Sequence, residues 1–242
     1  MANGELWRMG DMFQLSVELY DTKDKKVVWS DRWQEKWENL PSIKGSLSDG
    51  LLKALDTKSK VEKTVETNNT EAYEYYLKAK YKFDKRKKTE DIILCRGLLL
   101  KSIEIDKSLI DSYMCLGDTY FFQESDRKIA LRYYKQSLKI SKEVKNKKNI
   151  ARSYYSIAAV HWSKDNVPLS RSYCEKALNI FIKLNLEIQA TAVQRLLANL
   201  LAMEGNIDAA IDKYNIIVDI QKKHEDKIGL AHTYVCMANV TI

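Results

Sequence analysis

Proline and glycine are scarce in this chain of 242 residues, which contains 2 Pro and 8 Gly. The turns of a many-stranded β-protein depend on these residues, so their scarcity disfavours a β-sandwich or a β-barrel. Hydrophobic residues make up 45% of the chain and charged residues 30%, which is too apolar for an intrinsically disordered protein. The composition therefore predicts a mainly α-helical fold.

The sequence also has no run of about 18 apolar residues, the length that a membrane-spanning helix needs. Residues 1–5 lack the charged and apolar regions of a signal peptide. We therefore expect no membrane segment in this chain and a cytoplasmic location, although a longer parent protein could be attached to a membrane.

Motifs of catalysis and cofactor binding are absent as well. The sequence has no Gly-rich phosphate loop, no Gly-x-Ser-x-Gly elbow and no His-Glu-x-x-His motif. His161, His224 and His232 have no carboxylates at metal-ligand spacing. We expect a protein that is not an enzyme and that binds neither a cofactor nor a metal ion.

The four cysteines stand alone in the sequence, at Cys95, Cys115, Cys174 and Cys236. None forms the Cys-x-x-Cys pair of a zinc or redox site. Cysteine is among the residues most often buried, so we expect all four to be reduced core residues.

The net charge of +7 is compatible with an acidic partner. Lysine and arginine cluster in residues 78–88 and 142–148. These clusters allow an alternative function, the binding of nucleic acid or of another anionic surface, although solvated helix faces explain them more simply. We therefore regard nucleic acid as the less favoured partner.

The N-terminal region predicts a β-hairpin followed by a helix. Apolar and polar residues alternate over 13–19, the period of a strand with one buried face, and a looser alternation returns over 27–33. After Pro41, apolar residues recur every four positions from Ile43 to Leu55, as in one stripe of a helix. Because an isolated hairpin is marginal in water, we expect the rest of its sheet to lie upstream of Met1.

Residues 10–55 resemble the C-terminal end of the TolB-like domain of bacterial regulatory proteins. The resemblance rests on Gly10-Asp11, Leu19-Tyr20-Asp21, Trp29 and the helix from Ile43 to Leu55. It implies a partial α/β segment over residues 1–58, followed by a linker over 59–68. It also implies a larger signalling protein, whose effector in such proteins is often a nucleotide cyclase or a transcription factor.

A repeated pattern dominates the rest of the chain. Small residues follow a long apolar residue at Gly117, Ala158, Ala198 and Ala238, which are 41, 40 and 40 residues apart. A second pattern of small and bulky residues follows each of the first three, beginning at Ala130, Ser170 and Ala210. Small residues at a fixed period indicate helices that approach closely in a stacked array.

This pattern resembles the tetratricopeptide repeat (TPR), best matched by Tyr113, Leu116-Gly117, Tyr120, Ala130 and Tyr134. The resemblance covers residues 69–242, as about four units and the first helix of a fifth. It implies a right-handed superhelix of helix pairs. We therefore predict a mainly α fold, preceded by the short β-hairpin and helix.

In this family the first helices of the units line a concave groove that holds a peptide or a partner helix, so the resemblance implies a protein-binding scaffold. The predicted groove residues are Asp111, Met114, Asp118, Phe121, Phe122, Arg152, Tyr155, Trp162, Arg195, Asn199, Met203 and Asn239. Asparagine in the Asn199 column suits a peptide backbone because an amide both donates and accepts. Nearby arginines favour an acidic or C-terminal carboxylate ligand.

Some of these side chains have an equally good structural explanation, since Phe122 and Trp162 fit between units and Asn199 fits a local bond. A purely structural function also stays open. The array could space two other domains or form a homodimer.

Overall fold

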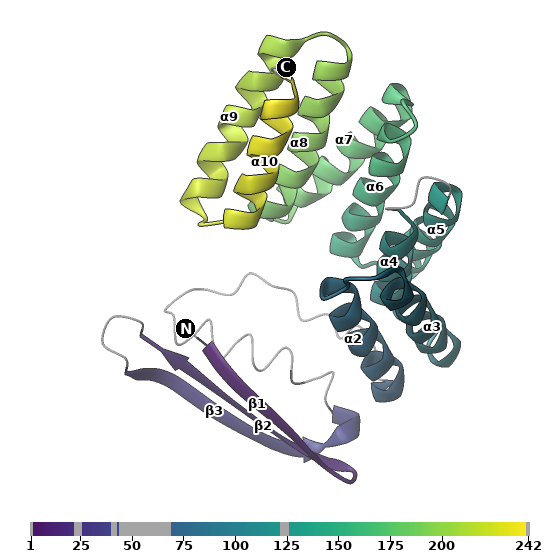
Figure 1. Ribbon diagram of the computed structural model, residues 1–242, viewed down its shortest axis with the longest axis vertical. Coiled ribbons are helices and arrows are strands. Elements are labelled where there is room, and N and C mark those ends of the chain that lie inside the picture. The colour runs from purple at the N-terminus through teal and green to yellow at the C-terminus, as the bar shows by residue number, and fades with distance from the viewer. Residues whose placement is uncertain (1, 22–25, 40–42, 44–68, 122–125, 241–242) are drawn as a thin grey trace. The chain divides into compact units, whose positions relative to one another are not determined.

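The structure is a computed structural model that describes residues 2–21, 26–39, 43, 69–121 and 126–240. The chain divides into two compact units, residues 1–112 and 113–242. The first contains a small sheet and a helix pair, and the second contains a helical array (Figure 1).

The sheet of the first unit has three antiparallel strands in the order β1-β2-β3: β1 (Ala2–Met9), β2 (Met12–Tyr20) and β3 (Val27–Lys36). The prediction of a two-stranded hairpin is therefore wrong, because the sheet has a third strand, β1. Strand β1 pairs with β2 through a tight turn at Gly10-Asp11, where Gly10 has a φ of 60°. Its side chains from Asn3 to Met9 are exposed, so the strand has no buried stripe that alternation could reveal.

A short 3-10 helix, η1 (Trp37–Asn39), follows the sheet. The helices α2 (Thr70–Asp84) and α3 (Thr89–Ile105) then form the first helix pair. Thr70 donates a hydrogen bond of 2.6 Å to the carbonyl oxygen of Glu38. The predicted helix from Ile43 to Leu55 lies outside the described residues, apart from Ile43 itself.

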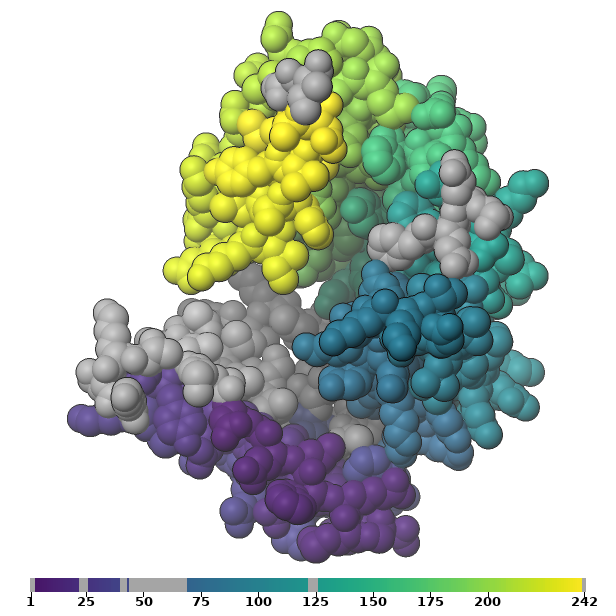
Figure 2. Space-filling view, viewed as in Figure 1, coloured from purple at the N-terminus to yellow at the C-terminus, as the bar shows by residue number. Residues whose placement is uncertain are grey.

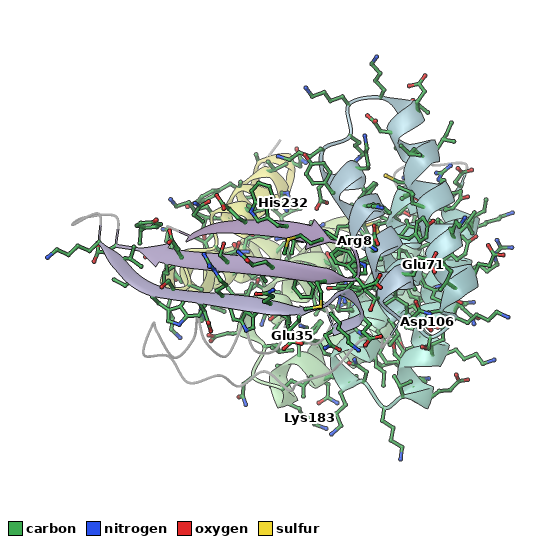
Figure 3. The ribbon with its side chains drawn as sticks, turned by 90° about the horizontal axis from the view of Figure 1, so that it is seen from below. Arg8, Glu35, Glu71, Asp106, Lys183 and His232 are labelled. Atoms are coloured by element: carbon green, nitrogen blue, oxygen red, sulfur yellow. The ribbon has the colours of Figure 1, made fainter. Side chains whose placement is uncertain are left out.

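Arg8 connects the sheet to the helix pair within this first unit. Its guanidinium lies 3.5 Å from the Glu74 carboxylate on α2 and 4.2 Å from the ring of Trp37. Figure 3 shows Arg8 at the end of the sheet that faces α2.

Seven helices of similar length make up the rest of the described chain. They are α4 (Ile110–Phe121), α5 (Arg127–Glu143), α6 (Lys147–Trp162), α7 (Val167–Lys183), α8 (Glu187–Met203), α9 (Ile207–Lys223) and α10 (Lys227–Val240). Each helix from α5 to α9 packs on the next along the chain. The prediction of a mainly helical repeat array is confirmed, and α4, α6, α8 and α10 are the first helices of its units.

The small residues of the repeat lie where two helices of a unit meet. Ala158 and Ala198 are fully buried, and Ser170 on α7 donates a 3.0 Å hydrogen bond to the carbonyl oxygen of Ala158. At Gly117 the approach is closer still, because a Cβ atom there would overlap the ring of Tyr134 on α5. The size of this residue therefore sets the distance between α4 and α5.

The helices α5 to α9 end in turns that recur every 20 residues. The residues with positive φ in these turns are Lys145, Asp165, Asn185, Gly205 and Glu225, with φ between 53° and 82°. After each, the next backbone N–H bonds to the carbonyl five residues earlier, as from Asn146 to Ser141 at 2.9 Å. This is the Schellman arrangement that satisfies helix C-terminal carbonyls, and its even spacing gives the helices equal lengths.

All four cysteines are free thiols, and all but the half-buried Cys236 are buried. Burial raises the pKa of the Cys174 thiol to about 12, which keeps it protonated near neutral pH. Three of the four therefore lie in the core as predicted, whereas Cys236 is only half-buried.

Candidate partner-binding face

The first helices of neighbouring units lie side by side. α6 contacts α8, and α8 contacts α10, in addition to their contacts with second helices. Residues in equivalent positions of the first helices therefore form columns that run from unit to unit. One column contains Asp118, Asn199 and Asn239, and another contains Met114, Tyr155 and Arg195.

Two residues of the first column accept hydrogen bonds from tyrosines on the second helices. Tyr134 on α5 donates a hydrogen bond of 2.7 Å to Asp118 Oδ1 on α4. Eighty residues later, Tyr214 on α9 donates one of 2.5 Å to Asn199 Oδ1 on α8. The same bond is thus made in two units, and in each it fixes the orientation of a predicted groove residue.

The second column is joined by an arginine. The Arg195 guanidinium on α8 interacts with the hydroxyl of Tyr155 on α6 and acts to lower its pKa. Burial raises the pKa of Tyr155, and the positive charge of Arg195 only partly opposes this. Burial likewise raises the pKa of Tyr214 to about 12, and Arg195 again acts in the opposite direction.

These contacts form one group, which we call the polar network: Asp118, Tyr134, Tyr155, Arg195, Asn199 and Tyr214. Burial, followed by the neighbouring Asp118 carboxylate, raises the pKa of Tyr134, and Tyr155 acts in the same direction. In the unit between Tyr134 and Tyr214, the equivalent second-helix residue is the smaller Cys174. The polar network therefore extends from α4 to α9, within residues 113–242.

Known structures with this arrangement of helices identify the fold. Aspartyl phosphate phosphatase F from Bacillus subtilis matches 81% of this chain with a TM-score of 0.59 and 15% identity. A signal-transduction ATPase from Pyrococcus horikoshii with a tetratricopeptide repeat sensor matches 84% with a TM-score of 0.55 and 21% identity. A kinesin light chain from Podosopora anserina with TPR-like repeats matches 69% with a TM-score of 0.51 and 15% identity. The fold is a TPR-like solenoid.

The chain spans only part of some of these proteins: 50% of the phosphatase and 32% of the ATPase, against 84% of the kinesin light chain. No protein-family model matches the sequence, and no curated protein matches it. At these identities the likeness establishes the TPR-like fold alone.

Within the TPR-like array, the predicted groove residues differ in how far they reach the surface. Asp111 and Met114 are buried, with 6% and 5% of their surface exposed, and Ser153 donates to the sulfur of Met114 over 3.7 Å. Both belong to the packed interior, so we omit them from the face proposed below. Trp162 is half-buried against the core formed by α6, α7 and α8.

Four other predicted residues reach the surface to different extents. Met203 is 44% exposed at the end of α8, and Asn239 is exposed on α10. Figure 2 shows α10 (yellow) open on the side that faces the viewer. Arg152 is half-buried and donates a 2.8 Å hydrogen bond to Asn149, and Phe121 is half-buried on α4.

Phe122 lies outside the described residues. The sequence analysis did not predict that Tyr134 and Tyr214 belong to this face, although both stand in the recurring second-helix pattern. Their common position there is the signal that could have identified them.

The lysine cluster of residues 78–88 is interrupted by acidic side chains. Lys78 lies 2.5 Å from Glu74, and Lys80 lies 3.0 Å from Asp84. Asp91 accepts hydrogen bonds from the backbone N–H groups of Lys87 and Lys88, which lower the pKa of its carboxyl group. The cluster is therefore a mixed-charge surface.

In the part of the chain that the structure covers, no three His, Cys, Asp or Glu side chains gather as metal ligands. Among the helices described, none combines the length and the apolar character needed to span a bilayer.

Proposed function

We propose that this chain is a protein-interaction scaffold, and that its partner binds across the first helices of the TPR-like array. The observation that carries the proposal is the polar network. It orients Asn199 through Tyr214 and brings Arg195, one turn earlier on α8, to Tyr155, without consuming their capacity to bind a ligand.

The chemistry of this pair suits a carboxylate or a peptide backbone. A guanidinium has five N–H donors, so the interaction of Arg195 with Tyr155 leaves donors that can bind a carboxylate. Tyr214 uses the amide oxygen of Asn199, so the amide N–H₂ group is the natural donor to a ligand carbonyl. We therefore expect an acidic segment or a C-terminal carboxylate in the partner.

Preorganisation supports the same function. Side chains that are already held by hydrogen bonds lose little rotamer freedom when a ligand binds, and each side chain immobilised on binding costs about 0.5–1.5 kcal/mol. Met203 lies one turn after Asn199 and offers an adaptable apolar contact beside the polar pair.

A regulatory role in a larger bacterial signalling protein is the finer form of the proposal. It rests on the resemblance of residues 10–55 to a TolB-like domain, which remains a prediction, as does the domain division at residues 58 and 69. The absence of catalytic motifs from the sequence favours binding over catalysis.

The test is affinity capture from a lysate of the source organism with the full chain as bait. The double variant Arg195→Ala/Asn199→Ala is compared with Lys213→Ala/Asn215→Ala, which removes one cation and one amide from exposed positions on α9. Circular dichroism checks that both remain helical. We expect captured proteins to be lost with the first variant and retained with the second; unchanged capture by the first variant would contradict the proposal.

A further inference from the structure

The basic residues of this chain are concentrated in one part of the helical array. Residues 127–183, which form α5, α6 and α7, contain 14 Lys and Arg but only 3 Asp and Glu. The local net charge is therefore +11, whereas the whole chain has +7. The rest of the chain is net acidic, so the overall value conceals a strongly basic region.

Five of these cations form a continuous stripe on α5. They are Lys128, Arg132, Lys135, Lys139 and Lys142, spaced four, three, four and three residues apart. This spacing places side chains on one face of a helix, and all five are exposed. At 1.5 Å per residue the stripe is about 21 Å long. We call it the α5 stripe.

The repeats provide an internal control for its role. The equivalent positions of α7 are Pro168, Ser172, Glu175, Asn179 and Ile182, and those of α9 are Asp208, Asp212, Asn215, Asp219 and Lys222. These two helices pack in the same array with neutral or acidic stripes. The fold therefore does not require cations at these positions, and their presence on α5 needs another explanation.

The stripe is poorly neutralised within the described structure. Of its five cations, only Lys139 has an ion pair among the described residues, with Glu143 at the limiting distance of 4.0 Å. Arg132 lies 5.2 Å from the ring of Tyr133, and Lys142 lies 5.6 Å from the ring of Tyr154. The cations thus lie beside aromatic rings more than beside carboxylates.

Aromatic rings lie on α5 and on the helices packed near it. Tyr133 stacks on Tyr120 with a centroid distance of 5.8 Å, and Tyr173 on α7 stacks on His161 at 5.7 Å. Each of these four rings is half-buried. Lys176 lies 5.1 Å from the ring of Tyr173.

Further cations act on the second pair of rings. Burial, and then the positive charges of Lys135 and Lys164, lower the pKa of His161. At the end of α7, Lys183 points away from the helix (Figure 3).

We propose that the α5 stripe and the aromatic rings near it bind a single-stranded nucleic acid, with phosphates on the cations and unpaired bases on the rings. The combination of a basic track with aromatic side chains suits such a ligand. A protein partner is less suitable, because interface cores are depleted of lysine and the stripe contains no apolar residue. The absence of apolar residues also disfavours insertion into a lipid surface.

This site uses none of the residues of the polar network, so it does not depend on the proposed partner-binding function. Binding through phosphates must weaken with salt, with a slope of log K against log salt of about −0.7 for each phosphate contacted. Non-specific affinities of this kind are on the order of 10⁻⁴ to 10⁻⁶ M at physiological salt.

The test is fluorescence anisotropy with a labelled 20-nucleotide oligouridylate and the full chain, between 50 and 200 mM salt. The triple variant Arg132→Gln/Lys135→Gln/Lys139→Gln is compared with Lys78→Gln/Lys80→Gln/Lys82→Gln, which removes the same charge from α2. We expect the α5 variant to lose roughly tenfold or more in affinity and its salt slope to fall by about 2, since three phosphate contacts are removed. The α2 variant should change by less than about threefold.

Three results would overturn the proposal. The first is an equal loss of affinity in both triple variants, which would reflect net charge alone. The second is equally effective competition by poly-glutamate, which would indicate an acidic protein partner. The third is equal binding to vesicles containing anionic lipid. An oligothymidylate of the same length tests RNA against DNA, and either preference agrees with the proposal.

Discussion

Tyr214 on α9 donates a hydrogen bond of 2.5 Å to the amide oxygen of Asn199 on α8, at the position equivalent to the bond from Tyr134 to Asp118 eighty residues earlier. A second-helix tyrosine thus orients a first-helix polar residue in two units. The repeat is therefore conserved within the chain in a hydrogen bond as well as in its packing residues.

Removing this hydroxyl should destabilise the array. We expect Tyr214→Phe to lower the free energy of unfolding by about 1 kcal/mol, because a typical intramolecular hydrogen bond contributes about 0.5–1.5 kcal/mol. The control is Tyr234→Phe on α10, where the ring is exposed; it should change stability by less than about 0.5 kcal/mol. Urea unfolding measures both, and equal values for the two variants would refute the role given to the Tyr214 hydroxyl.

Two glycines in helices should respond to alanine in opposite ways. Gly117→Ala forces a Cβ atom into the ring of Tyr134, and overpacking of this kind costs about 1–3 kcal/mol. Gly97 on α3 is exposed and has open space around its Cα. Gly97→Ala should therefore stabilise the protein by about 0.5–1 kcal/mol, because alanine favours a helix. Thermal unfolding measures the change in stability of each variant. Stabilisation by Gly117→Ala would show that α4 and α5 are farther apart than described.

The turns between helices offer a separate test. Lys145 has a φ of 56°, a conformation that costs a residue other than glycine about 1 kcal/mol or more. We expect Lys145→Gly to raise the free energy of unfolding by up to about 1 kcal/mol, and Gly205→Ala, at a φ of 82°, to lower it by a similar amount. A loss of stability in Lys145→Gly would mean that the lysine side chain stabilises its turn more than the backbone strain destabilises it.

His161 should make stability depend on pH. Burial, Lys135 and Lys164 lower its pKa below the ordinary value of 6.5, so the unfolded chain binds the proton more readily than the folded chain. The contribution of His161 to stability is therefore lost as pH falls below about 6.5. Tyr120 stands at the position of the preceding repeat that is equivalent to His161, so His161→Tyr introduces a residue that the repeat already accepts there. In this variant, stability should fall less between pH 7 and pH 5.5. Urea titrations at both pH values measure this difference, and identical pH dependence in wild type and variant would contradict the assigned shift.

The repeat was predictable from the sequence because close helix packing demands small residues, and these recur at Gly117, Ala158, Ala198 and Ala238. Strand β1 was not predicted, because its exposed side chains leave no alternating pattern. Of the evenly spaced turns between helices, the sequence predicted only the one at Gly205-Asn206. Four of the five positive-φ positions in these turns contain Lys, Asp, Asn or Glu, and of these residue types only Asn and Asp favour that conformation at all.

The candidate site was predictable only in part. Aligning the first helices at the repeat spacing identifies the residues that share a face, and Arg195 and Asn199 were found in this way. Spacing does not show that Asp111 and Met114 are buried, because burial depends on the helices packed around them. The sum of charges over the chain likewise concealed the α5 stripe, since acidic residues elsewhere offset it.

The most direct measurement of the central claim is site-specific photo-crosslinking. A photoreactive phenylalanine analogue is placed at Met203, which is exposed beside Asn199 on the first-helix face, or at Asn215, which is exposed on α9. We predict that a partner is captured covalently from position 203, that Arg195→Ala/Asn199→Ala abolishes this capture, and that position 215 captures little. Equal capture from position 215, or capture from position 203 that survives the double substitution, would contradict partner binding across the first helices.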